Sequence, residues 1–85
     1  MIVSFSPSFL KKAGKLPPDL QDEIDDKISL FKENPNHPFL RTHRLHGRLC
    51  EKWSFSVNYK YRIIFEYLSS DEVKLLSVGS HNVYN

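Results

Sequence analysis

The chain has 85 residues, of which 40% are hydrophobic and 13% aromatic, and its formal net charge is +2. A chain of this length forms a single domain, residues 1–85, because neither half would keep a core of its own, and the apolar content excludes wholesale disorder. No apolar run approaches the ~20 residues that a membrane span needs, so the composition also excludes a helical integral membrane protein.

The first 35 residues predict a strand followed by two helices. Residues 2–5 form a short apolar strand, and Ser6-Pro7 supplies the N-cap and the first-turn proline of a helix that ends at Gly14. A second helix follows and ends at Asn34-Pro35. Its apolar residues recur at intervals of three and four and form one stripe: Leu20, Ile24, Ile28 and Phe31. We expect the two helices to form a hairpin whose apolar residues belong to the core.

The rest of the chain predicts an irregular basic segment and three strands. Residues 36–49 are polar and basic, with four apolar residues that we expect to anchor them: Phe39, Leu40, Leu45 and Leu49. Residues 52–57 alternate, so that Trp53, Phe55 and Val57 face inward. Residues 61–68 are apolar on both faces except for Arg62 and Glu66, as in a central strand, and residues 72–78 form the last strand.

The predicted order is therefore β-α-α-β-β-β, an α+β fold. We expect a small antiparallel sheet, in which a three-stranded meander is joined by the first strand, with the N-terminal helical hairpin on one face.

Positive charge is concentrated in residues 35–60, which carry five Lys or Arg residues against Glu51 alone. A basic patch on a nearly neutral protein indicates an acidic or polyanionic partner that is met at one face. A solvated loop that is rich in arginine explains the charge equally well.

The sequence offers no metal site, since its single cysteine, Cys50, is accompanied by no C-x-x-C or H-x-x-x-H spacing. We expect no cofactor. One cysteine cannot form an internal disulfide, and no secretory signal precedes the first strand, so we expect a cytoplasmic protein.

Arg62 lies inside the most apolar of the predicted strands. A guanidinium in such a place must be paired or hydrogen-bonded, because an unpaired charge in an apolar environment costs several kcal/mol. One interpretation is an internal ion pair with Glu66 on the same strand. The other is a bidentate clamp for a phosphate group at the sheet surface.

Two further segments carry groups suited to phosphate chemistry. His81 follows Gly79-Ser80 directly after the last strand, where an imidazole can give or accept a proton near neutral pH, and Tyr84 can contact a phosphate or stack on a base. Residues 43–48 hold two histidines and two arginines. Alternatively, these segments are a frayed tail and a basic loop.

RNA cleavage needs this inventory of side chains. A 2′-hydroxyl must lose a proton, the crowded phosphorane must be neutralised, and the leaving 5′-oxygen must gain a proton. None of these steps requires a metal ion.

These motifs together resemble the RelE/ParE superfamily of bacterial toxins, and in particular its messenger-RNA-cleaving RelE, YafQ and YoeB branch. The resemblance covers the whole chain and rests on Leu45-His46-Gly47 leading to Trp53-Ser54, on residues 61–65, and on residues 79–81 with Tyr84. It implies a ribosome-dependent endoribonuclease that cuts translated mRNA and is held inactive by a cognate antitoxin. A homodimer or a toxin–antitoxin heterotetramer is the expected assembly.

The resemblance also implies roles for individual residues. Arg62 matches the arginine that stabilises the transition-state phosphate, and His81 matches the C-terminal histidine that acts as a general acid or base. His43 resembles the loop histidine of YafQ-like members, and Tyr84 resembles the terminal aromatic residue that contacts substrate. Five residues are expected to bind ribosomal or messenger RNA: Arg44, His46, Arg48, Lys52 and Lys60.

The chain departs from the family pattern at Ser54 and Ser56, near which several active relatives carry a basic or histidine side chain. The general base is therefore open among His43, His46 and Lys52. Two other functions fit the resemblance: a ParE-like toxin that blocks DNA gyrase by binding and does not need His81, and an inactive member that only binds an antitoxin.

Overall fold

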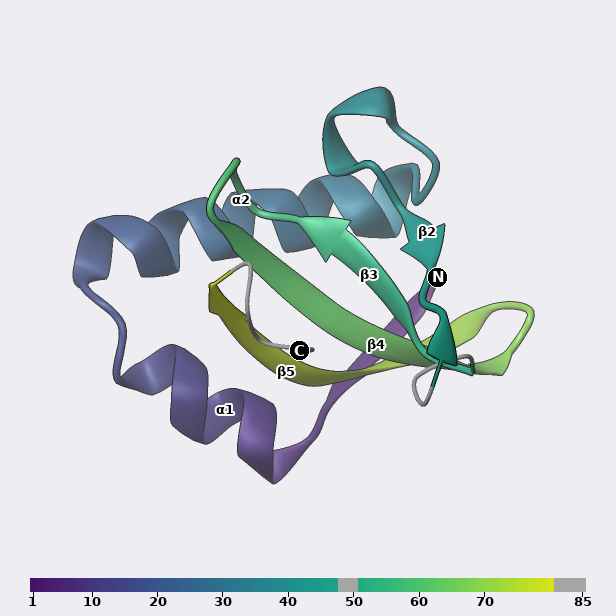
Figure 1. The fold of residues 1–85 in the computed structure, drawn as a ribbon, viewed down its shortest axis with the longest axis horizontal. Coiled ribbons are helices and arrows are strands. Elements are labelled where there is room, and N and C mark those ends of the chain that lie inside the picture. Colours follow the sequence, from purple (N-terminus) through teal and green to yellow (C-terminus); the bar gives the residue numbers. More distant parts are fainter. Residues whose placement is uncertain (48–50, 81–85) are drawn as a thin grey trace.

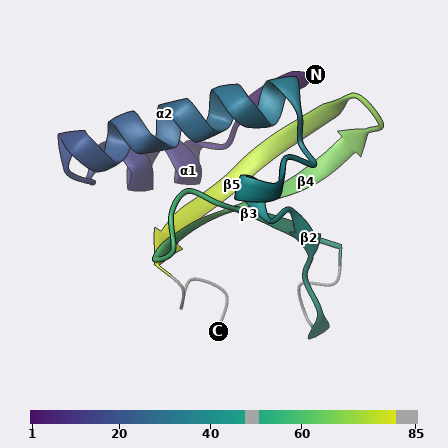
Figure 2. The same ribbon diagram turned by 90° about the horizontal axis from the view of Figure 1, so that it is seen from above.

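The computed structural model describes residues 1–47 and 51–80 and consists of a five-stranded sheet with two helices on one side (Figures 1 and 2). In chain order, its elements are β1 Ile2–Phe5, α1 Pro7–Gly14, α2 Pro18–Glu33, the 3-10 helix η1 Pro38–Leu40, β2 His43–Arg44, β3 Trp53–Ser56, β4 Tyr61–Ser69 and β5 Glu72–Ser80. The predicted α+β fold with its N-terminal helical hairpin is confirmed. The structure adds β2, a two-residue strand in the segment that the sequence predicts to be irregular.

The sheet is mixed rather than purely antiparallel. Its strand order is β1-β5-β4-β3-β2, and β1 runs parallel to β5, with Ile2 opposite Glu72 and Phe5 opposite Leu75. The other three pairings are antiparallel, as the meander predicts. The first and last strands of the chain therefore lie side by side, although about 70 residues separate them in sequence (Figure 1).

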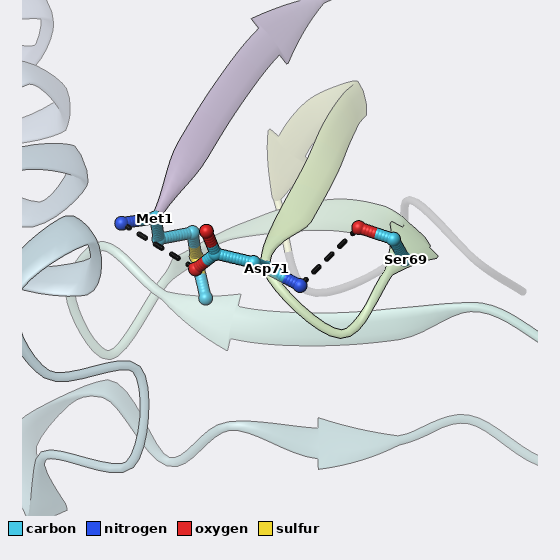
Figure 3. Close-up of polar contacts among 3 residues, drawn as sticks. All are labelled: Met1, Ser69 and Asp71. Atoms are coloured by element: carbon cyan, nitrogen blue, oxygen red, sulfur yellow. Dashed lines mark hydrogen bonds and ion pairs between the residues drawn. The ribbon is translucent and has the colours of Figure 1, made fainter.

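The start of β1 is held by the turn between β4 and β5. The N–H of Ile2 donates to the carbonyl of Asp71 at 2.9 Å, and the ammonium group of Met1 lies 3.8 Å from a carboxylate oxygen of Asp71. Within the turn, the N–H of Asp71 donates to Oγ of Ser69 at 3.3 Å (Figure 3). Since the Asp71 side chain is largely exposed, its ion pair contributes at most about 1 kcal/mol.

Helix α1 begins and ends where the sequence predicts, and α2 ends at the predicted Asn34. The hydroxyl of Ser6 accepts a hydrogen bond from the N–H of Phe9 at 3.0 Å, which caps α1, and donates one to the carbonyl of Leu76 at 3.0 Å. The cap therefore also fastens α1 to β5. In the described parts of the chain, neither helix has the length and apolar character that crossing a membrane demands.

The core lies between the helices and the inner face of the sheet. Phe31 of α2 is fully buried, stacks on Phe55 of β3 with ring centroids 4.4 Å apart, and meets Phe65 of β4 edge-on at 4.9 Å. Ile24 and Ile28 complete the buried stripe of α2. The inward direction of Phe55 and Val57 is confirmed, whereas Trp53 is half-buried.

The segment between α2 and β3 corrects one prediction. Leu40 and Leu45 are buried anchors, as expected, but Phe39 is 73% exposed. Phe39 is the middle residue of η1, and this tight turn directs adjacent side chains to different sides, so burying Leu40 leaves Phe39 in solvent. Leu49 lies outside the described residues.

Candidate functional site

One face of the sheet is covered by the helices, and the other, here called the outer face, carries most of the polar strand residues. Antiparallel partners share a face, and the register pairs Ser56 with Arg62 and His43 with Ser54. Since Phe55 points toward α2, its neighbours Ser54 and Ser56 point outward, and so do their partners. His43 and Arg62 therefore lie on the same face.

Arg62 is held through one nitrogen of its guanidinium. Its Nη1 donates to Oγ of Ser56 at 3.0 Å and to the carbonyl of Asn58 at 3.1 Å. The donors on Nη2 and Nε have no partner within residues 1–47 and 51–80. Because a guanidinium grips a phosphate or carboxylate with a pair of parallel N–H groups, this free edge is suited to bidentate anion binding.

Of the two interpretations of Arg62, the internal ion pair with Glu66 is wrong. Glu66 instead accepts a hydrogen bond from Nζ of Lys52 at 2.8 Å. Residues four apart on one strand lie ~13 Å from each other, whereas Lys52 lies directly across the hairpin from Glu66. Cross-strand register, not position along β4, therefore decides the partner of Glu66.

The loop between β3 and β4 is organised by Asn58. Its Oδ1 accepts from the N–H groups of Lys60 and Tyr61, both at 2.8 Å, and its Nδ2 donates to a carboxylate oxygen of Glu23 on α2 at 2.8 Å. Side-chain bonds of this kind fix a tight turn and tie it to the helix. The Asn58 carbonyl that receives Arg62 is thereby fixed in place, and Arg62 with it.

Arg62 opens onto a groove of about 360 Å³ between α2, η1 and the β3–β4 loop, here called the edge groove. Three cationic side chains line it: Lys27, Arg41 and Arg62. Within the described ranges, none of the three forms an ion pair with a carboxylate. The remaining lining residues are Glu23, Pro38, Phe39, Ser56, Val57, Asn58 and Tyr59. Its three cations, and the Nη2 and Nε of Arg62 that lack a partner among the described residues, make the groove suited to an anionic group.

His43 is exposed on the short strand β2, and its Nδ1 lies 2.8 Å from the carbonyl oxygen of Arg41. A carbonyl only accepts hydrogen bonds, so Nδ1 carries the proton, and Nε2 of the neutral ring is left to accept one. His43 and Arg62 stand two strands apart and two residues along the sheet, which places their Cα atoms about 12 Å from each other.

The other predicted site residues are scattered. Lys52 is engaged with Glu66, Lys60 lies over the ring of Tyr61 at 5.7 Å, and Arg44 and His46 are exposed. Arg44 pairs with Trp53 and so points away from the outer face. The structure does not bring these residues together with Arg62.

Three predicted site residues, Arg48, His81 and Tyr84, lie outside the described residues. The last described residue, Ser80, pairs with Tyr61, and Gly79 pairs with Arg62. Strand β5 therefore ends beside the site. No three His, Cys, Asp or Glu side chains gather into a possible metal-binding group in the part of the chain that the structure describes.

The two serines on β3 make a matched pair for a stability measurement. Ser54 is fully buried and its hydroxyl has no hydrogen-bond partner among the described residues, whereas the hydroxyl of Ser56 accepts from Arg62. Ser54→Ala is expected to leave the free energy of unfolding unchanged or to raise it by up to about 1 kcal/mol, because an unsatisfied buried hydroxyl is removed. Ser56→Ala should lower it by about 1 kcal/mol. Urea unfolding of both variants checks this, and a larger loss for Ser54→Ala would contradict it.

Sequence reasoning missed most of the edge groove. Glu23 and Lys27 are one turn apart on the polar side of α2, a spacing that places them on one helix face but does not say what lies opposite. Arg41 adopts a left-handed φ of 49° as the chain leaves η1, and no glycine marked that turn. Asn58 can be recognised as a turn residue from the sequence, but its hydrogen bond to Glu23 of α2 cannot.

Comparison with known proteins gives a clear result for structure and none for sequence. No protein-family model matches the chain, and no curated protein sequence matches it. Among solved structures, YafQ from E. coli strain BL21(DE3) matches with a TM-score of 0.80 at 14% identity, over 98% of this chain and 97% of that chain.

Two further structures match at similar level. A chain of the toxin–antitoxin complex RelBE2 from Mycobacterium tuberculosis gives a TM-score of 0.78 at 18% identity, over 94% of this chain and 96% of that chain. The YoeB/ParE toxin from Agrobacterium tumefaciens gives 0.76 at 16% identity, over 95% and 99%. The resemblance read from the sequence is thus confirmed in the fold: the chain has the architecture of the RelE/ParE toxins over nearly its whole length.

Proposed function

We propose that this chain is the toxin of a toxin–antitoxin pair and that it cleaves translated mRNA on the ribosome. The fold that it shares with YafQ and the YoeB/ParE toxin supports the first part. The observation that carries the second part is the geometry of Arg62: it lines an open groove, its Nη1 is fixed by Ser56 and Asn58, and its Nη2 and Nε have no partner among the described residues.

The proposed reaction is an internal transfer at phosphorus. The 2′-oxygen attacks the adjacent phosphorus as its proton passes to a base, and the bond to the 5′-oxygen breaks as that oxygen takes a proton from an acid. The products are a 2′,3′-cyclic phosphate and a 5′-hydroxyl end. Arg62 stabilises the negative charge that grows on the phosphorane oxygens, where a fixed cation acts most strongly.

Of the candidate bases, His43 suits the role best. It shares the outer face with Arg62, and its Nε2 has no partner among residues 1–47 and 51–80, so it can accept a proton. Lys52 is held by Glu66 and His46 is not aligned in a strand with the site. We assign the acid to His81, which follows the strand that ends beside Arg62.

The proposed partners are the ribosome with its mRNA and a cognate antitoxin. A chain of the RelBE2 toxin–antitoxin complex shares the fold, which supports an antitoxin partner. We expect the antitoxin to carry a segment of acidic and apolar residues, because the cations around the edge groove need a complementary charge when they are covered.

Primer extension on mRNA from cells that express the chain without a partner tests the function. Induction should stop growth and produce new 5′ ends inside translated codons. His81→Ala should reduce these ends by about a hundredfold or more, since a general acid contributes that much to proton transfer, while the purified variant stays folded by circular dichroism.

Two outcomes of that comparison count against the proposal. Intact transcripts in growth-arrested cells would contradict the proposed nuclease activity. Growth arrest that survives His81→Ala and is accompanied by DNA damage would point instead to a toxin that binds gyrase.

A further inference from the structure

We propose that the edge groove binds one nucleotide of single-stranded RNA next to the scissile phosphate, with its base stacked on Phe39 or Tyr59. The proposal rests on the function proposed above and extends it, since it assigns a substrate-binding role to residues outside the reacting centre. The groove is continuous with Arg62, so its occupant adjoins any phosphate that Arg62 holds.

The two aromatic rings are the first observation. Phe39 is 73% exposed and Tyr59 is 92% exposed, and both line the groove. The core explains neither, because the buried aromatic cluster is built from Phe31, Phe55 and Phe65. Exposed rings beside a cationic groove are the platforms on which single-stranded bases stack.

The charge of the groove is the second observation. Lys27 and Arg41 flank it in addition to Arg62, while Glu23, its one carboxylate, is occupied by the side-chain amide of Asn58. A base stacked on Phe39 or Tyr59 carries a phosphate on each side of its sugar. One of them can meet Arg62 and the other Arg41 or Lys27.

The size of the groove favours a single nucleotide. Its volume of about 360 Å³ stands at the lower end of the range for small-ligand sites. Its rings stand at the surface and not at the bottom of a closed cavity, which suits an unpaired base within a longer strand better than a free metabolite.

The test is equilibrium binding of a fluorescein-labelled 2′-O-methyl RNA hexanucleotide to the full chain, followed by anisotropy at fixed salt. The probe lacks the nucleophilic 2′-hydroxyl, so binding is measured without cleavage. Phe39→Ala and Tyr59→Ala should each weaken binding by about tenfold if their ring stacks on a base, and the double variant should lose at least that much. Both residues are exposed, so the variants should fold.

Lys27→Gln and Arg41→Gln should weaken binding, and each should lower the salt dependence by about 0.7 in the slope of log K against log salt. Matched controls come from residues 10 and 15, which do not line the groove. Leu10→Ala on α1 removes an exposed apolar side chain, and Lys15→Gln removes an exposed cation. Neither should change the affinity for the probe by more than twofold.

Each outcome decides the proposal. Wild-type affinity in the double variant, or no binding of the probe to the wild-type chain, overturns it. Loss of binding to a co-expressed antitoxin with RNA affinity unchanged also overturns it, because the groove would then hold a protein segment. If the wild-type chain cuts mRNA in cells but the double variant binds the probe normally, the proposed nucleotide site is wrong and the proposed nuclease function is retained. If the variants lose RNA binding while the wild-type chain cuts no mRNA, the proposed nucleotide site is retained and the proposed nuclease function is wrong.

Discussion

Arg62→Gln is expected to lower the rate of mRNA cleavage by about 10²–10³-fold while the chain remains folded. The reason is that different nitrogens of the Arg62 guanidinium have different partners. Nη1 is used by Ser56 and Asn58, whereas Nη2 and Nε have no partner among the described residues and are the donors that we propose for the substrate. Glutamine can keep a hydrogen bond to one of these partners, but it brings no positive charge to the phosphorane. The loss should therefore fall on the reaction and not on the fold.

Two further variants separate charge from geometry at this position. Arg62→Lys keeps the charge but has no planar fork, so it should recover only a small part of the lost rate. Ser56→Ala keeps the whole guanidinium but removes one of its two restraints, so it should reduce the rate by about tenfold or less. The expected order of activity is wild type, Ser56→Ala, Arg62→Lys and Arg62→Gln.

The measurement is the yield of new mRNA 5′ ends per unit of soluble protein, with thermal unfolding recorded for each variant. Full activity of Arg62→Gln would show that Arg62 has no role in the reaction. Equal activity of Arg62→Lys and wild type would show that only a point charge is needed, and would contradict the bidentate contact.

The sequence predicted local structure well, because the signals for it are local. Ser6 and Pro7 begin α1, Asn34 follows the end of α2, and the stripe of Ile24, Ile28 and Phe31 is buried. Each of these features depends on residues within one or two turns of the chain. The same holds for the strands of the meander, where short connections force antiparallel neighbours.

The sequence could not predict what depends on contacts between distant segments. The parallel pairing of β1 with β5 joins the two ends of the chain, and nothing in Ile2–Phe5 specifies its neighbour. Arg62 could be recognised as unusual, yet its restraint by Ser56 follows from the hairpin register, and its open groove follows from the position of α2 and η1. Arg41 is one of five cations in the basic segment 35–60, and the sequence does not single it out. Lys27 lies outside that segment, so its place in the groove could not be predicted from the charge pattern.

Phe31→Ala is expected to lower the free energy of unfolding by about 3–5 kcal/mol. Phe31 is fully buried, and its ring contacts Phe55 face to face and Phe65 edge-on, so it joins α2 to the two central strands. Truncation removes both aromatic contacts and leaves a cavity between the layers, which the rigid sheet cannot close. Since a domain of this size has a total stability of about 4–13 kcal/mol, the variant should be close to unfolding.

Phe39→Ala is the matched control, because it removes the same ring from a surface position. With 73% of Phe39 exposed, its truncation should change the free energy of unfolding by no more than about 0.5 kcal/mol. Urea unfolding of the two variants measures the contrast directly, and similar losses for both would contradict the burial that separates them. A stable Phe39→Ala would also show that any change in its RNA affinity comes from the lost ring and not from a damaged fold. The stability of this one variant thus decides whether the binding experiment on the edge groove can be interpreted.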